Sequence, residues 1–185
     1  KADLSGANLG KNQNTVANLT NADLTGAILT DAVLSDANLT GANLTGANLT
    51  GANLTSTVLT GANLTGADLT GATLTTVVIN GATTNLTSAI LVGADLGADD
   101  LTGVDLEKAD LRGADLVGTD LENAILTGAN LGKNGDDATD LRGATLTGAK
   151  LGKADLSGAN LGKNGDTAAN LTNADLTGAI LTDAV

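Results

Sequence analysis

The feature that most constrains this sequence is a period of five residues. Leucine or another branched apolar residue stands at every fifth position from Leu19 to Ile79, and the series resumes from Leu86 to Leu131. An α-helix repeats its faces every ~3.6 residues and a strand at every second residue, so neither element can extend through this pattern. Glycine fills many fifth positions and Asn or Asp precedes most leucines, and these residues favour turns. The sequence therefore predicts a chain that bends once in every quintet.

Each quintet has an expected inside and outside. In Ala62, Asn63 and Leu64, the alternation of an extended backbone points Ala and Leu to one side and Asn to the other. The interior must be filled by Leu, Ala, Val and Ile, because the chain has no Phe, Tyr, Trp, Met, Cys, Pro or His. We therefore expect a leucine-rich core beneath a surface of Asn, Asp and Thr.

The quintet A-[DN]-L-[TS]-G, as in "ANLTG" and "ADLTG", resembles the pentapeptide-repeat family over essentially all 185 residues. The resemblance implies an all-β fold, a right-handed quadrilateral parallel β-helix with four quintets in each coil. With the polar interruptions counted as in register, 36 quintets make about nine coils. Stacked coils would align identical side chains in ladders, and Leu24, Leu44 and Leu64 are expected to form one ladder of the core.

We expect residues 1–185 to form one solenoid with two kinds of irregularity. A two-residue slip in register falls near residues 82–83. Three related stretches, "GKNQNTVANL", "GKNGDDATDL" and "GKNGDTAANL", break the leucine series while the flanking leucines stay ten residues apart. This spacing predicts that the coil continues with one face lacking its apolar centre at Asn14, Asp136 or Asp166. A tolerated bulge or a short outward loop is favoured over a ligand site.

The two ends of the sequence are nearly identical. Residues 153–185 repeat residues 1–33 with three differences, at an offset of 152. This duplication indicates a segment of a longer array. Neither end carries a helix or an aromatic plug that would cap a solenoid, so we expect the end coils to stack on further coils of the same kind. The expected partner is therefore this protein itself, end to end or within a longer chain.

Acidic residues are concentrated in residues 95–122. This segment carries nine acidic and two basic side chains, which is −7 of the formal net charge of −12. With a twenty-residue coil, the acidic side chains of neighbouring coils should stack about 5 Å apart and attract a cation or a basic protein, although a solvated acidic face is the favoured interpretation. The predicted partner surface consists of Asp95, Asp100, Asp105, Asp110, Asp115 and Asp120, in which Asp95 stacks on Asp115 and Asp100 on Asp120.

Five aspartates are the candidates for metal ligands. Asp99 occupies the inward position that is usually Ala, and the polar interruptions have the composition of a calcium loop without its ordered ligands and closing Glu. The candidates are Asp99, Asp100, Asp120, Asp136 and Asp166. Because no ordered ligand set appears, the sequence predicts no metal site and no cofactor.

Composition excludes several classes of function. Without His or Cys, no pairing of a nucleophile with a base is apparent, so we predict no enzymatic activity and no catalytic residue. A net charge of −12 opposes binding to nucleic acid or to an anionic membrane surface. No apolar run approaches the ~18 residues of a membrane-spanning helix.

The leading hypothesis is structural. It describes an uncapped β-solenoid that forms, or belongs to, an extended fibre, stalk or spacer, extracellular or on a cell surface. The alternative comes from the resemblance, which implies an acidic mimic of duplex DNA that binds DNA gyrase. Those relatives commonly carry central Phe residues and an aromatic-rich dimerisation segment, and this chain has neither. Minor alternatives are an ice-binding surface on threonine columns such as Thr20, Thr40 and Thr60, and an engineered consensus solenoid.

Overall fold

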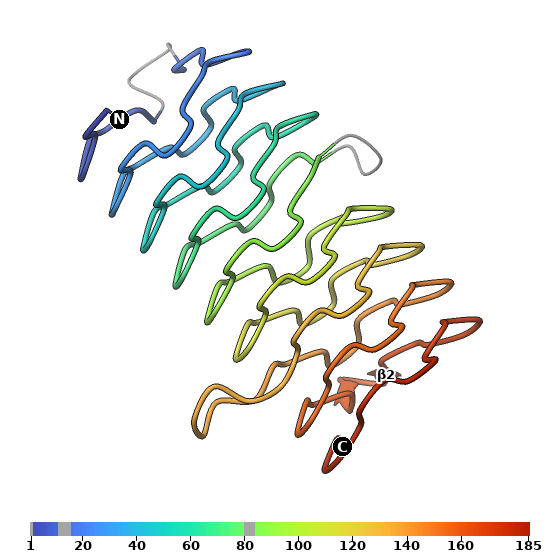
Figure 1. The fold of residues 1–185 in the computed structure, drawn as a ribbon. Helices are drawn as coiled ribbons and strands as arrows, with labels where there is room; N and C mark the ends of the chain where they lie inside the picture. Colours follow the sequence, from blue (N-terminus) through green and yellow to red (C-terminus); the bar gives the residue numbers. More distant parts are fainter. Residues whose placement is uncertain (1, 11–15, 80–83) are drawn as a thin grey trace.

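The protein is a rod of stacked four-sided coils (Figure 1). The computed structural model describes residues 2–10, 16–79 and 84–185. The residue before each central leucine pairs in parallel with its equivalent in the next coil, as Asn43 does with Asn63 and Asn48 with Asp68. These pairs are twenty residues apart, so four quintets complete one coil. The fold is the predicted right-handed quadrilateral parallel β-helix.

Most of the pairing occurs through single residues, and extended strands are rare. The two strands of the described chain are β1 (Lys163–Asn164) and β2 (Thr167–Ala168), which pair antiparallel. Among the described residues, no helix has the length and apolar character needed to cross a membrane. The regular structure of the rod therefore lies in the pairing between coils.

The corners of the coil are built by one residue in each quintet. The second residue after the central leucine has a positive φ, for example 60° at Gly46 and 56° at Asn21. Just before this corner, Asn43 Oδ1 accepts hydrogen bonds from the amide of Thr45 at 3.1 Å and from its hydroxyl at 2.6 Å. Glycine tolerates positive φ and Asn holds the turn through its side chain, which explains the residues found there. The prediction of one bend per quintet is confirmed.

The core is a column of leucines flanked by inward alanines. Leu44 and Leu64 have no exposed surface, as predicted for the ladder. Leu24, the third member of that predicted ladder, is only partly buried against the core because it lies in the first coil. The amide of Leu24 donates to Asn43 and that of Leu44 to Asn63, so the three leucines stand in successive coils and Leu24 is the less buried member.

The second polar interruption leaves the coil. Asp110 pairs with Asn130, and Asp115 on the next face pairs with Asp140. Asn130 and Asp140 thus occupy consecutive faces, and the quintet between them is extruded as the orange loop beside the rod in Figure 1. The prediction that the coil continues with an empty centre at Asp136 is wrong, whereas the predicted outward loop is confirmed.

The third interruption is extruded in the same way. β1 and β2 form a hairpin whose turn contains Gly165, with a φ of 61°, and Asp166. Asp136 lies in the equivalent turn, between Asn134 and Asp137, whose backbones exchange hydrogen bonds of 2.7 and 3.1 Å. Asp136 and Asp166 are therefore residues of exposed turns and not the centres of coil faces.

The first interruption has the same effect on pairing. Asn8 pairs with Val33, 25 residues away, and Asn18 with Asn38, 20 residues away. Asn14 itself lies outside the described residues. Because the three interruptions do not lengthen the rod, the stack holds slightly more than eight coils, close to the nine expected.

The register changes once more in the middle of the chain. Residues 82–83, where the slip is expected, lie outside the described residues. On either side of them, Val58 pairs with Val78 at a spacing of 20 residues and Asn63 with Asn85 at a spacing of 22. Parallel pairing continues beyond this point, so the described residues form a single stack.

Candidate functional site

The acidic side chains of residues 95–122, here called the acidic belt, wind around the rod. Asp95 pairs directly with Asp115, and Asp100 pairs with Asp120 on the next face. The sequence therefore placed these four residues correctly. Adjacent carboxylates on paired residues repel one another, so each pair raises the local negative potential.

The remaining aspartates of the predicted surface occupy the other two faces. Asp105 stands between Asn85 and Ile125, and Asp110 stands between Ile90 and Asn130. Their neighbours along the rod are uncharged. The acidic belt is therefore a ring on all four faces, and a flat partner could contact only part of it.

One column of the belt is longer than the sequence predicted. Asp115 pairs on its other side with Asp140, which places three carboxylates in a row with Asp95 at the far end. A strict twenty-residue period would have placed residue 135 there. The extruded loop brings Asp140 into the column, and the signal that could have revealed it is the polar Asp136 at the place of a central leucine.

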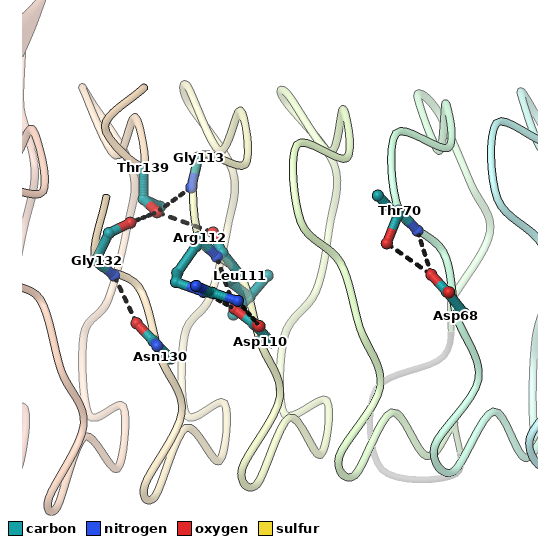
Figure 2. A network of polar contacts seen from close by, with 9 residues as sticks. All are labelled: Asp68, Thr70, Asp110, Leu111, Arg112, Gly113, Asn130, Gly132 and Thr139. Atoms are coloured by element: carbon teal, nitrogen blue, oxygen red, sulfur yellow. Dashed lines mark hydrogen bonds and ion pairs between the residues drawn. The ribbon is translucent and has the colours of Figure 1, made fainter. Parts of the chain in front are cut away.

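Two arginines neutralise parts of this surface. Arg112 binds Asp110 through two hydrogen bonds, of 2.8 Å from Nε and 2.6 Å from Nη2, and these bonds hold the pKa of Asp110 below its usual value (Figure 2). Arg142 binds Asp140 at 2.7 Å in the same manner. Burial opposes the ionisation of Asp140, but the hydrogen bonds from Arg142 outweigh it and lower its pKa. Both of these aspartates are thus ionised at neutral pH.

Asp100 is also anionic. The hydroxyl and amide of Thr102 lower the pKa of Asp100, with the amide 3.0 Å from Asp100 Oδ1. Glu107 pairs with Lys108 at 2.8 Å on the exposed surface. The belt can therefore attract a cation or a basic group, but it contains no base and nucleophile in contact.

A buried hydroxyl closes the base of the extruded loop. Thr139 Oγ1 lies 2.8 Å from the carbonyl oxygens of Leu111 and Gly132, and it accepts a hydrogen bond of 3.0 Å from the amide of Gly113 (Figure 2). The loop also packs on the preceding coil, because a Cβ at Gly113 would lie 3.1 Å from the Cβ of Asn134. These contacts fix the point at which the chain leaves and re-enters the coil.

Asp99 is buried in the core and does not belong to the belt surface. Its residue exposure is 3%, which confirms its predicted inward position. Neither carboxyl oxygen has a hydrogen-bond partner among the described residues. Burial raises the pKa of Asp99 to about 7, and the amides of Thr76 and Val77 only partly oppose this effect.

The five metal candidates are not brought together. Asp99 is in the core, while Asp100 and Asp120 form a pair on one face. Asp136 and Asp166 lie in the turns of two different loops. Within the described part of the chain, no three acidic side chains are close enough to hold a metal ion.

An open cavity of about 320 Å³ lies beside the extruded loop. Lys133 reaches across Gly158, where a Cβ would lie within 3.0 Å of its Cδ and Cγ atoms. The lining balances two cationic and two anionic side chains, so it has no net preference for ligand charge. The lining residues are Arg112, Asn130, Gly132, Lys133, Asp155, Ser157, Gly158, Thr182 and Asp183.

Two threonines of the column that contains Thr20, Thr40 and Thr60 are hydrogen-bonded within their own quintets. The hydroxyls of Thr20 and Thr40 each donate to the preceding Asn, at 2.6 Å. Their hydroxyl hydrogens therefore point to Asn side chains of the protein itself and not to solvent. The ice-binding interpretation stays a prediction.

The pentapeptide repeat model matches eight copies along this chain, over residues 17–55, 37–75, 100–133, 138–162 and 167–185. No curated protein matches the chain. Among solved structures, it is similar to HetL, a pentapeptide repeat protein involved in heterocyst differentiation regulation from the cyanobacterium Nostoc. The two are 38% identical with a TM-score of 0.46, over 99% of this chain and 82% of that chain.

Two further solved structures are similar to this chain. QnrB1, a plasmid-mediated fluoroquinolone resistance protein, is 20% identical with a TM-score of 0.33, over 99% of this chain and 88% of that chain. A pentapeptide repeat protein from the Arabidopsis thaliana thylakoid lumen is 28% identical with a TM-score of 0.24, over 63% of this chain and 66% of that chain. The family model matches well over half of the residues, and the chain belongs to the pentapeptide repeat family.

Proposed function

We propose that this protein is a structural solenoid that acts as a spacer in an extended fibre or stalk and catalyses no reaction. The observation that carries the proposal is the pairing of every neighbouring pair of coils, from Asp3 with Ile28 to Asp155 with Ile180. Beneath this pairing runs a continuous column of buried leucines. A stack of this kind gains length by repetition, because each coil offers the next one the same core and the same backbone partners.

The chemistry of the surface favours a spacer function over that of a binding module. Away from the acidic belt it consists largely of short polar side chains, and many of these bond to their own quintet, as Asp68 does with Thr70 (Figure 2). Side chains satisfied in this way offer few anchors to a partner. Protein interfaces are usually centred on aromatic residues and Arg, and this chain has no aromatic residue at all.

The end coils support association along the rod axis. Leu171 and Leu176 are only partly buried, and Leu181 is 41% exposed. Further coils of the same kind would cover these leucines as Leu44 and Leu64 cover one another. The proposed partner is therefore another stretch of the same solenoid, in the same chain or in a second copy.

Electron microscopy of the purified chain at increasing concentration tests this proposal. Wild type should form particles that lengthen with concentration beyond the roughly 40 Å of eight coils spaced ~4.8 Å apart. Leu176→Asp places a charge in the open end of the core and should restrict the particles to short rods. Thr172→Asp, on the exposed side of the same coil, is the matched control and should still lengthen. Short rods of wild type at every concentration would reject end-to-end stacking.

The DNA-mimic alternative has less support. The negative net charge of the chain agrees with this alternative. However, the carboxylates of the belt encircle one section of the rod, whereas duplex phosphates run along the whole length of a DNA helix. A gyrase supercoiling assay separates the two functions. Inhibition by wild type that is lost when Asp100 and Asp120 are both changed to Asn would favour the alternative over the spacer.

A further inference from the structure

Buried threonines in this core follow a common rule. Thr57 donates its hydroxyl hydrogen to the carbonyl oxygen of Leu34, and Thr119 donates to Leu96, both at 2.8 Å. In each case the acceptor is the leucine on the preceding face of the previous coil. The same arrangement recurs at Thr84 with Leu59 and at Thr139 with Leu111. A polar residue at the inward position is thus satisfied by a leucine carbonyl of the neighbouring coil.

The acceptor in these contacts already holds one hydrogen bond. The carbonyl oxygen of Leu34 accepts the amide of Ala37 at 2.9 Å as well as the hydroxyl of Thr57. A carbonyl oxygen has two lone pairs and can accept both. The inward side chain must therefore supply a hydrogen.

Asp99 occupies the same column as Thr57 and Thr119. It follows Val77 in the stack and precedes Thr119, and the leucine that corresponds to its acceptor is Leu74. The carbonyl oxygen of Leu74 accepts the amide of Val77 at 3.1 Å, as Leu34 does from Ala37. A carboxylate has no hydrogen to give to Leu74, whereas a carboxylic acid has one.

The coils around Asp99 offer its carboxylate no cation. The previous coil contributes Leu74 to Ile79, which contain no titratable group. Its own coil and the next one contribute the outward carboxylates of the belt, of which Asp95 further raises the pKa of Asp99. The two cations of the belt are already paired, Lys108 with Glu107 and Arg112 with Asp110. The amides of Thr76 and Val77 lower the pKa of Asp99, but burial outweighs them, so the neutral acid is the form that this environment favours.

The contact between these two coils is also the least regular on this face. Val78 pairs with Val58 and Asp100 with Asp120, but within the described ranges Val78 and Asp100 are not paired with each other. Val78 is 51% exposed. On the neighbouring faces the same two coils are joined normally, for example by Thr73 with Asp95.

Backbone strain is present on both sides of this contact. Thr76 has a φ of 57° and Ala98 a φ of 59°, and each lies immediately before the inward residue of its coil. Left-handed backbone costs about 1 kcal/mol or more for residues other than glycine. The contact between residues 74–79 and 96–101, here called the Asp99 junction, therefore lacks a backbone pairing that its neighbours on this face have, and it has a non-glycine residue with positive φ on both sides.

We propose that Asp99 is a protonation-dependent latch in this junction, closed when the neutral acid donates to the carbonyl oxygen of Leu74 and loosened when the side chain ionises. The closed latch reproduces the contact of Thr119 with Leu96. The open latch places a charge between Val77 and Thr119, which separates the two coils on one face. The rod then carries a pH-sensitive joint between its halves, whatever the solenoid spans.

Two nuclear magnetic resonance measurements on the full chain test the latch. The ¹³C carboxyl signal of Asp99 should titrate with a midpoint near 7. The amide of Leu74 donates to Asp95 across the two coils at 2.8 Å, and its protection against hydrogen exchange, corrected for intrinsic exchange, should fall about tenfold between pH 6 and pH 8.

Variants separate the latch from general acid effects. Asp99→Thr keeps a donor without a titrating group, so the protection of the Leu74 amide should no longer depend on pH, and Asp99→Asn should behave in the same way. Asp115→Asn alters the surface of the belt and should leave the pH dependence intact. A carboxyl midpoint near 4, or the same pH dependence in wild type and both Asp99 variants, would overturn the proposal.

Discussion

Thr119 donates its hydroxyl hydrogen to the carbonyl oxygen of Leu96 over 2.8 Å and so joins two neighbouring coils from inside the core. One coil earlier, Asp99 occupies the same position and has no partner among the described residues. A hydroxyl can always donate, but a carboxyl group can donate only when it is protonated. The two residues therefore make the stability of one core column depend on pH at a single coil.

The first prediction concerns this dependence. Because the pKa of Asp99 is raised from 3.8 to about 7, the folded chain binds its proton more tightly than the unfolded chain. The contribution of Asp99 to stability is then greatest below about pH 4, falls as the pH rises to about 7, and is constant above that. The free energy of unfolding of Asp99→Thr should gain about 4 kcal/mol over wild type across this range, because each pKa unit corresponds to about 1.4 kcal/mol. Urea unfolding of both proteins at a series of pH values measures it, and a constant difference would contradict the assignment.

The second prediction compares two leucines of one column. Leu64 is fully buried between two coils, whereas Leu24 is partly buried in the first coil. Leu64→Ala leaves a cavity that the layers above and below cannot close, and it should cost about 3 kcal/mol. Leu24→Ala should cost about 1 kcal/mol, because its site is already open on one side. Denaturant unfolding of both variants checks this, and equal losses would show that the end coil is not open.

The quintet pattern was sufficient to predict the turns, the inward leucines and the buried position of Asp99. The pairing of Asp95 with Asp115 followed from the same period. The pattern could not distinguish an extruded quintet from one that stays in the coil, because Leu131 and Leu141 are ten residues apart in both cases. The energetic difference lies in Asp136, since a carboxylate at the centre of a face would lose its hydration without gaining a partner.

For the same reason, the sequence does not predict that Asp140 pairs with Asp115. Its place beneath Asp115 depends on how many residues leave the coil, and a periodic count assumes that none do. Likewise, the half-buried state of Leu24 depends on what covers the first coil and not on the quintet itself.

The third prediction is that one loop can be removed without disturbing the rod. Deletion of residues 134–138 joins Lys133 to Thr139 and leaves Leu131 and Leu141 five residues apart. The faces keep their register, so the free energy of unfolding should change by less than about 1 kcal/mol. Deletion of residues 104–108 is the matched control, because it also removes five residues but takes the buried Leu106 with them and should cost at least about 2 kcal/mol. Thermal unfolding followed by circular dichroism compares the two, and greater damage from the loop deletion would contradict the extruded quintet.

The fourth prediction concerns charge repulsion in the column of Asp95, Asp115 and Asp140. Asp115→Asn removes the central charge and should stabilise the protein by about 0.5 kcal/mol at low salt. Screening at about 1 M salt should abolish the gain. Asp110→Asn should have the opposite sign, because it removes the partner of Arg112. Denaturant unfolding of wild type and Asp115→Asn at the two salt concentrations measures this. A loss of stability in Asp115→Asn would contradict repulsion and would indicate a site that needs all three carboxylates.

Amide hydrogen exchange across the second interruption tests the continuous coil most directly. The amides of Leu131 and Leu141 donate to Asp155 and Asn160 of the next coil, at 2.6 and 2.7 Å. Both should be strongly protected, whereas the amides of Gly135 and Asp136 between them should exchange at nearly the rate of an unstructured chain. Protection of Asp136 equal to that of the leucines, or a loss of protection at Leu141, would contradict a single solenoid from which the polar quintets are extruded.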